Sequence, residues 1–586
     1  MNKLNFSLCR KASGVRALLI ILLVINFSSF SQEDTFNREV QVVREYNPSI
    51  TDAFKINDMP LASDTLKSTP VFNYQLKGKA IITPPEMVPM TVARLAKEPL
   101  DKLFPAYIQG YIGNYDIRGD IIGGKLLYNL VRNEKFVAAL NIAHESSFGD
   151  IELENKDEVE ADYHETKAGL YLRHFFNKSN LSVNMDFNNF AYRYYGFENI
   201  FNTNTRQRQT VFDMNARLNN RVLKNSTQYD VLFGFYIFEN KTGVVENSFL
   251  YKGDFNFELN EFILRFETSV DYAGSRIDKV SNPFDQFYTY ENRDYTLLQI
   301  NPALIRKQDN FLIKLGVRIG QGFDILGDKF YFSPDVGVNL TIENAVMIQA
   351  GITGEVKPNS YRGIMAENPF INTDLNVKTG FHQAKFFAGI SGNFNSKTSF
   401  GFRVEYGNFA SEHFFVNRIY PNQDSTIYNY DNKFDVQYDD GRLLSVSGEL
   451  KANIVSKLDL VLRAAYYGWK TDSLEKAWHK PNMELGFRAI YKATKDLHFS
   501  AVFNVLGERF ALIPPEIVEI DGNKQIITNT KILKPVYDFN LGANYTLNSR
   551  WHFFCTIQNL FASKYYQFNG YPMHGINARI GAGYSF

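Results

Sequence analysis

Cysteine is scarce in this sequence of 586 residues, which contains only Cys9 and Cys555. Cys9 precedes the apolar run ALLIILLVI and is expected to be lost with a secretory signal peptide, which leaves Cys555 alone. The mature chain then forms no intrachain disulfide. A lipid-acceptor cysteine would follow the apolar run, so the sequence also argues against a lipoprotein.

Net charge is absent as well, because 63 Lys and Arg residues balance 63 Asp and Glu residues. Nucleic-acid binding normally requires a basic excess, so we expect no nucleic-acid partner. The nine histidines show none of the close spacings of zinc ligands, and no nucleophile elbow, phosphate-binding loop or calcium loop occurs. We therefore expect no enzyme activity, no cofactor and no metal site.

Long apolar runs are missing after the first 31 residues. The initial run is about ten residues long, whereas a helical bilayer span needs roughly 20. It follows Lys3, Arg10, Lys11 and Arg16 and is followed by small residues, which is typical of a secretory signal peptide. Residues 1–31 are therefore predicted to be a signal peptide, and the protein is expected to leave the cytoplasm.

Prolines are concentrated between the signal peptide and residue 105, where eight of the nineteen lie. Because proline fixes φ and removes a hydrogen-bond donor, residues 32–103 are predicted to form an irregular periplasmic or lumenal segment. We expect part of it to dock onto a strand edge or into a lumen, since apolar and aromatic residues are frequent there; a disordered tether is the alternative. The docking residues predicted are Val40, Val42, Val43, Tyr46, Pro48 and Phe54.

From residue 104 to residue 586 the chain repeats an alternation of apolar and polar residues. In 180–188, for example, Leu181, Val183, Met185 and Phe187 alternate with polar residues. A period of two predicts β-strands with one apolar and one polar face.

Short and long connections between these strands also alternate. Seven short polar turns fall at 132–135, 176–180, 259–262, 306–310, 394–399, 454–457 and 546–550, and long segments fall at 148–162, 275–292, 356–378, 412–440 and 511–533. Short turns on one rim and long loops on the other predict an all-β transmembrane antiparallel barrel of about 22 strands over residues 104–586, with periplasmic turns and extracellular loops. A propeller or stacked sandwiches are the alternatives, but no blade repeat is visible.

The polar faces of the strands carry charges of both signs, which we expect to line a wet lumen with weak ion selectivity. These residues are Asp186, Lys314, Arg318, Arg403, Glu405, Asp459, Arg463 and Arg579. The apolar faces are expected to meet lipid, and Cys555 shares such a face with Trp551, Phe553 and Ile557.

Aromatic residues are unusually frequent in the predicted loop Ser411–Asp440, which includes Phe414, Phe415, Tyr420, Tyr428 and Tyr430. Such a loop usually packs or binds a partner rather than meeting water. We expect it to pack into the barrel mouth, as the loop at 356–378 also could, or to contact a partner; sugar recognition is the alternative.

The C-terminus carries an apolar-alternating strand in which Ile580, Tyr584 and Phe586 form the predicted barrel signal. The segments QNLFASKYY (558–566) and GYPMHG (570–575), with this last strand, resemble the end of TonB-dependent receptors. The segment ENPFINTDLNVKTGF (367–381) looks like the Asn-Pro loop of their barrels. His574 and Ile576 depart from the proline and arginine that the family usually carries.

The resemblance stops at the N-terminus, because the family fills its barrel with a plug of well over a hundred residues. This chain has only 32–103 there, too short and too rich in proline for a compact plug. The segments EVQVVREYNPSITDAFKINDMP (39–60) and KLFPAYIQGYIGNY (102–115) resemble those of plugless receptor-like barrels of Bacteroidota. We therefore expect a cell outer-membrane protein that contacts outer-membrane lipid and is inserted by the barrel assembly machinery.

Two functions remain open at this point. The first is a non-energised transport channel or receptor-like barrel. The alternative is a scaffold or accessory subunit of a larger outer-membrane machine for barrel assembly or protein export, with outer-membrane or periplasmic protein partners.

Overall fold

The structure is a computed structural model, and it describes residues 104–586 apart from 116–118, 197–205, 221–226, 278–292, 325–326, 344, 373, 376, 422–427 and 521–522. The predicted signal peptide and the segment 32–103, with Val40, Val42, Val43, Tyr46, Pro48 and Phe54, lie outside the described residues.

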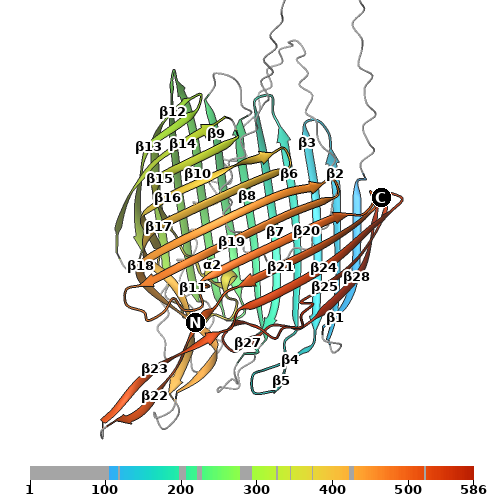
Figure 1. The fold of residues 1–586 in the computed structure, drawn as a ribbon, viewed down its shortest axis with the longest axis vertical. Helices are drawn as coiled ribbons and strands as arrows, with labels where there is room; N and C mark the ends of the chain where they lie inside the picture. Colours follow the sequence, from blue (N-terminus) through green and yellow to red (C-terminus); the bar gives the residue numbers. More distant parts are fainter. Residues whose placement is uncertain are drawn as a thin grey trace, which may run out of the picture. The chain divides into compact units, whose positions relative to one another are not determined.

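Twenty-two antiparallel strands form one sheet that closes on itself, because β1 pairs with both β2 and β28 (Figure 1). This confirms the predicted fold class and strand number. In chain order the strands of the barrel are β1 (Ala106–Tyr115), β2 (Gly119–Arg132), β3 (Phe136–Phe148), β6 (Tyr163–Phe175), β7 (Ser179–Arg193), β8 (Arg206–Asn220), β9 (Gln228–Asn240), β10 (Val244–Leu259), β11 (Phe262–Ile277), β12 (Arg293–Gln308), β13 (Phe311–Asp324), β14 (Lys329–Ile342), β15 (Val346–Lys357), β16 (Gly380–Asn395), β17 (Thr398–Pro421), β18 (Tyr428–Val455), β19 (Leu458–Thr471), β20 (Met483–Lys492), β21 (Leu497–Leu506), β24 (Val536–Leu547), β25 (Trp551–Gln558) and β28 (Asn577–Ser585).

Short hairpins and one helix lie in the long connections at one rim of the barrel. They are the strand pairs β4 (Asp150–Glu152) with β5 (Glu158–Glu160), β22 (Arg509–Ile520) with β23 (Asn523–Leu533) and β26 (Tyr566–Phe568) with β27 (Tyr571–Pro572), and the helix α2 (Tyr361–Glu367). Ser360 caps α2 by accepting a hydrogen bond from the Gly363 amide at 2.9 Å. In the described part of the chain, no helix has the length and apolarity of a membrane span.

The seven predicted short turns all lie on the rim that holds the start of β1 and the end of β28, which we take as periplasmic. The loop expected at 411–440 is different in the structure. β17 and β18 continue far beyond their other neighbours, since β16 pairs with β17 only up to Ala410 and β19 pairs with β18 only from Gly441. Residues 412–421 and 428–439 therefore form a two-stranded ribbon, called the ribbon below.

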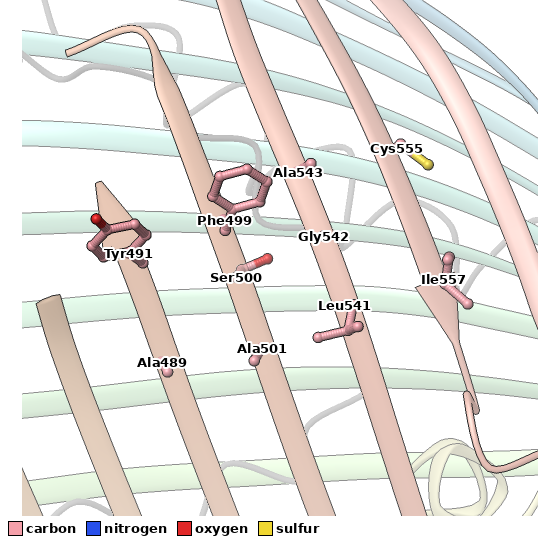
Figure 2. Close-up of a pocket in the computed structure, with 10 residues that line it drawn as sticks. All are labelled: Ala489, Tyr491, Phe499, Ser500, Ala501, Leu541, Gly542, Ala543, Cys555 and Ile557. Carbon is pink, nitrogen blue, oxygen red and sulfur yellow. The ribbon is translucent and has the colours of Figure 1, made fainter. Parts of the chain in front are cut away.

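The outer face of the barrel carries exposed large apolar side chains at alternate positions of the strands, such as Ile112 (62%), Leu315 (56%) and Phe386 (58%). Cys555 lies on this face, beside a shallow apolar depression of about 270 Å³ formed by β20, β21, β24 and β25 (Figure 2). The depression exists because Ala489, Ala501 and Ala543 have small side chains, and the larger Phe499, Leu541 and Ile557 border it. The face is suited to contact with lipid chains, as expected for an outer-membrane barrel.

The seam between β28 and β1 is held by backbone hydrogen bonds along both strands, ending with the Phe586 amide donating to the Ala106 carbonyl at 2.9 Å. Ile580 and Phe586 are exposed on the outer face, and the Tyr584 ring contacts Trp551 of β25 at a centroid distance of 4.8 Å. Across the seam on the other face, Arg579 donates to Glu145 of β3 at 2.9 Å. The first and last strands of the barrel are thus joined by backbone hydrogen bonds and by side-chain contacts.

Candidate functional site

The extracellular mouth of the barrel is crossed by direct contacts between opposite walls. Counted from β1 around the ring of 22, β7 is the fifth strand and β18 the sixteenth, so they stand eleven strands apart in either direction. Nevertheless, the side-chain amide of Asn432 on β18 donates to the backbone carbonyl of Tyr194, directly after β7, at 3.3 Å. The ribbon therefore reaches across the lumen.

A hydrophobic cluster fills this crossing, and we call it the aromatic cap. Its members come from one wall (β7, β9 and β10), from α2 and the chain after it, from the ribbon on the other wall, and from the β26–β27 hairpin. The thirteen buried residues are Tyr192, Tyr194, Phe238, Val244, Tyr361, Ile364, Met365, Ile371, Leu375, Phe415, Phe434, Phe568 and Tyr571.

Ring contacts at the centre of the cap join segments that are far apart in sequence. Phe370 stacks on Tyr571 with centroids 3.7 Å apart, and Tyr571 meets Tyr195 edge-on at 5.0 Å. Phe434 of the ribbon packs against Phe568 at 5.5 Å. Such aromatic pairs add roughly 0.5–1.5 kcal/mol each beyond their buried area. The cap is a packed core rather than a loose layer of loops.

Backbone pairing also connects the Asn-Pro loop to the ribbon. The Asn372 amide donates to the Phe434 carbonyl at 2.8 Å, and the Phe434 amide donates to the Phe370 carbonyl at 2.9 Å. Ile371 and Phe434 thereby form an isolated parallel bridge. This bridge ties the Asn-Pro loop to the ribbon.

On the opposite wall, Glu246 of β10 anchors the start of α2. Its carboxylate accepts hydrogen bonds from the Tyr361 amide at 2.7 Å and the Arg362 amide at 3.1 Å. The Tyr236 hydroxyl donates to the same carboxylate at 2.9 Å, and Arg362 pairs with Asp213 of β8 at 2.8 Å. Because a carboxylate at a helix start satisfies amides that lack helical partners, this contact fixes α2 against the wall.

A second, smaller cluster lies against the ribbon. Phe409, Phe414, Val416 and Trp478 are buried together, while Phe415 between them belongs to the aromatic cap. Alternate residues of the ribbon thus enter two different cores. The burial of Phe414 and Phe415 confirms the expectation that the aromatics of 411–440 pack; the side chains of Tyr420, Tyr428 and Tyr430 lie outside the described ones.

A buried ionic cluster surrounds Glu412 where the ribbon leaves the barrel wall. Lys480 Nζ lies 3.4 Å from its carboxylate, Lys357 Nζ 3.7 Å, and His382 Nε2 3.5 Å. Burial alone would raise the pKa of Glu412, but His382 and the two lysines outweigh it and hold that pKa well below the ordinary value. The cluster holds the charged Glu412 carboxylate at the base of the ribbon.

His479 is buried between the ribbon and the β26–β27 hairpin. Its Nε2 accepts from the Asn569 amide at 3.3 Å, so the proton is on Nδ1, which donates to the Phe415 carbonyl at 2.7 Å. Burial and the nearby charge of Arg509, only partly offset by the hydrogen bond to the Phe415 carbonyl, together lower the pKa of His479 to about 4. The ring is therefore neutral at pH 7.

Acidification is predicted to loosen the cap through His479. Because its folded pKa lies below the unfolded value, the unfolded cap takes up the proton first. The stabilisation is complete above about pH 6.5 and is lost as the pH falls to about 4, roughly 3 kcal/mol in all. Hydrogen exchange of cap amides between pH 7 and pH 4 measures it. His479→Gln should flatten this dependence and His498→Gln, at the periplasmic end of β21, should not; equal profiles for all three proteins would contradict the assignment.

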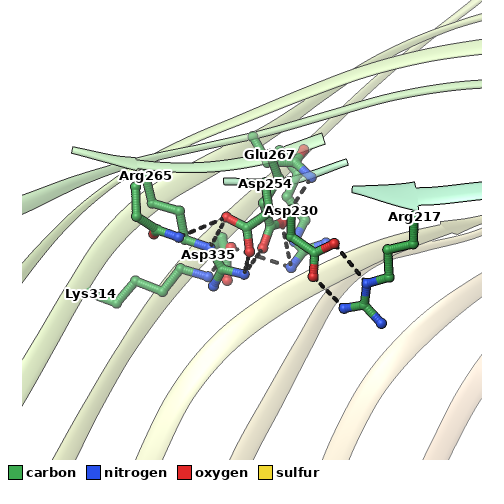
Figure 3. Close-up of polar contacts among 10 residues, drawn as sticks. Arg217, Asp230, Asp254, Arg265, Glu267, Lys314 and Asp335 are labelled. Carbon is green, nitrogen blue, oxygen red and sulfur yellow. Dashed lines mark hydrogen bonds and ion pairs between the residues drawn. The ribbon is translucent and has the colours of Figure 1, made fainter. Parts of the chain in front are cut away.

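Charged residues on the interior face of the wall are mostly paired with neighbours (Figure 3). Lys314 and Arg318 of β13 share Asp335 of β14, at 2.5 Å and 3.3 Å. On β11, Arg265 pairs with Asp254 of β10 at 2.7 Å and with Glu267 at 2.6 Å. The charges of this part of the wall therefore cancel locally.

The other residues predicted to face the lumen lie on the same polar faces. Arg403 pairs with Glu405 at 2.7 Å, Arg463 with Glu449 at 2.7 Å, and Asp459 with Lys492 at 2.8 Å. Arg579 pairs with Glu145, and Asp186 stands opposite Asp213 in the register of β7 and β8.

Sequence reasoning missed most of the acidic partners, namely Glu145, Glu267, Asp335 and Glu449, although each has the inward parity of its own strand. Within the described ranges, no group of three His, Cys, Asp or Glu residues is placed to hold a metal ion.

Solved structures similar to this barrel include outer-membrane receptors and transporters. The FrpB iron transporter from Neisseria meningitidis (F3-3 variant) gives a TM-score of 0.60 at 10% identity over 83% of this chain and 82% of that chain. The fold is that of a TonB-dependent receptor barrel.

Two further structures show the same likeness. The pyoverdine receptor FpvA from Pseudomonas aeruginosa PAO1 gives 0.59 at 12% identity over 83% of this chain and 79% of that chain. The siderophore receptor PirA from Acinetobacter baumannii gives 0.58 at 11% identity over 83% and 81%. No protein-family model and no curated protein sequence matches the chain. The barrel places the protein in the cell outer membrane, and none of these neighbours is an enzyme.

Proposed function

We propose that this protein is a receptor-like barrel that works as a transport channel without an energised plug of its own, with the aromatic cap closing its outer mouth at rest. The observation that carries the proposal is the cap itself, built by loops of the barrel over a polar, ion-paired interior wall. A lumen that is sealed by its own loops at the outer rim has no need of a plug there. The lumen-facing role of Lys314, Arg318, Arg403, Glu405, Asp459, Arg463, Arg579 and Asp186 is part of this proposal.

The aromatic cap acts as a gate that thermal motion alone does not open. Releasing the segment after β15 exposes five buried apolar side chains, Tyr361, Ile364, Met365, Ile371 and Leu375. At about 1.5–3 kcal/mol each, this costs roughly 10 kcal/mol, so spontaneous opening is very rare. Opening therefore requires a ligand or protein that binds the open state more tightly.

The scaffold function is the second candidate, and the hairpin β22–β23 favours it. These two strands pair only with each other and project beyond the rim of the barrel (Figure 1). A permanently closed barrel that offers such a hairpin suits a subunit of a larger machine. We expect insertion by the barrel assembly machinery in both cases.

Purification in mild detergent followed by a solute-swelling assay in liposomes separates the two functions. A barrel that elutes alone, and that passes small sugars once its cap is opened by mutation, supports transport. A stoichiometric protein partner that stays bound, combined with no sugar flux through the cap variant, supports the scaffold and contradicts the channel.

A further inference from the structure

Four basic residues gather on the outer face of the barrel at its extracellular end. Arg193 closes β7, Arg206 and Arg208 open β8, and Lys241 follows β9. Arg193 is directly opposite Arg206 in the register of β7 and β8. The Lys241 amide donates to the Arg208 carbonyl at 2.9 Å, and Lys241 Nζ donates to the Arg206 carbonyl at 2.7 Å. We call these four residues the basic cluster.

The parity of the strands places the cluster outside. Tyr192 and Gln209 point inward, since the Gln209 amide donates to the Tyr192 hydroxyl at 3.2 Å and Tyr192 belongs to the aromatic cap. Arg193 and Arg208 are their immediate neighbours in sequence, so their side chains leave from the opposite face. Arg206 and Arg208 are exposed accordingly.

Positive charge is in excess at this place. Arg193 pairs with Asp162, and with Glu160 at 2.6 Å. Among the residues that the structure describes, no carboxylate lies within 4.0 Å of the charged groups of Arg208 or Lys241. Within the same residues and the same distance, Glu239 on this face makes no ion pair. Burial and the charges of Arg206, Arg208 and Arg193 lower the pKa of Lys241. Mutual repulsion of these groups is relieved when an anion binds between them.

The cluster stands at the level of the outer head groups. Towards the periplasm the same face carries the exposed rings of Phe187, Phe212 and Phe235, and the exposed side chain of Ile237. Phe212 lies four residues from Arg208, a distance of roughly 13 Å along a strand. In a membrane barrel such an apolar band contacts acyl chains, and residues just beyond it reach the polar head groups.

We propose that the basic cluster binds the phosphate groups of a phosphorylated lipid of the outer leaflet. Arg208 and Lys241 hold the phosphate, with Arg193 and Arg206 beside them, and the acyl chains of the same lipid lie over the phenylalanines below. Arginine offers a planar, bidentate set of donors for phosphate, and lysine adds a point charge. The apolar band next to the cations selects a lipid over free phosphate, which gains nothing from it.

Lipid retention by the full-length protein tests this site. Protein purified in detergent is mixed with diphosphoryl lipid A, with the same lipid after removal of its phosphates, or with inorganic phosphate, and bound lipid is quantified per barrel by native mass spectrometry. At roughly fivefold for each basic residue near a membrane surface, Arg208→Gln with Lys241→Gln should weaken binding of the phosphorylated lipid about 30-fold.

The matched control removes the same two charges from the periplasmic rim, as Arg132→Gln with Lys135→Gln, and should bind like the unmodified protein. Heat-modifiable migration shows that each variant is folded. Equal binding of the phosphorylated and dephosphorylated lipids would overturn the proposal. Equal loss in the control variant, or full competition by millimolar inorganic phosphate, would overturn it as well.

Discussion

Opening the aromatic cap is expected to convert a poorly conducting barrel into a wide pore. In planar bilayers the intact protein should conduct little, because opposite walls are joined above the lumen. Phe434→Ala with Tyr571→Ala removes two fully buried rings, each worth about 3–5 kcal/mol in a core. That loss is comparable with most of the roughly 10 kcal/mol that hold the segment after β15 in the aromatic cap. The open fraction should rise by several orders of magnitude and appear as large, long-lived conductance steps.

The matched control for this experiment removes two rings from the outer face. Phe503→Ala with Phe539→Ala deletes an aromatic pair with centroids 6.2 Å apart, on strands β21 and β24. It should leave the low conductance unchanged. Large steady pores from the intact protein, or identical traces from both double variants, would show that the cap does not close the channel.

A deletion of residues 33–100 in the same assay addresses the proline-rich segment. We expect a several-fold further rise in conductance when the deletion is made in the cap variant. An unchanged conductance would mean that the proline-rich segment does not block the lumen, and the cap would remain the gate.

An arginine on the lipid face at mid-height should largely abolish assembly of the barrel. Ile300 lies near the middle of β12, and 43% of its side chain is exposed on the outer face. Ile300→Arg should cost about 2–4 kcal/mol at the bilayer midplane. The measurement is the folded fraction of outer-membrane protein, read from heat-modifiable migration of unboiled samples.

The neighbouring position provides the control, because Gln299 points to the other face and accepts a hydrogen bond from Ser269 at 3.3 Å. Gln299→Arg should cost no more than that hydrogen bond, about 1 kcal/mol. Equal yields of the two variants would mean that the outer face of β12 does not meet lipid.

Alternation and turn spacing were sufficient to predict the barrel. Each strand obeys a local rule, since every second residue meets lipid, and the short turns at positions such as 454–457 leave no freedom in connectivity. The sequence also identified 411–440 as unusual by its aromatic content. Its fate as a ribbon was not predicted, because the residues alternate irregularly around the bulge between Phe409 and Glu412.

The cap itself lies beyond such reasoning. Tyr195 and Pro572, joined by a hydrogen bond at 3.0 Å, are 377 residues apart in the chain. No local pattern marks two such residues as partners. The connections 472–482 and 559–576 supply the buried residues Trp478, His479 and Tyr571, and neither was among the predicted long loops. The acidic partners on the inner wall were within reach, since they follow strand parity.

The contact between β7 and β18 also has a mechanical consequence. A hoop of 22 strands deforms most easily by flattening into an ellipse. The aromatic cap acts as a strut along one diameter, from Tyr194 to Asn432, and packed cores compress little. Shortening of this diameter is resisted, and so is the bulging of the perpendicular one near β13 and β28 that would accompany it, because the sheet has a fixed circumference. A force applied to the ribbon is thereby felt at β7, half the circumference away.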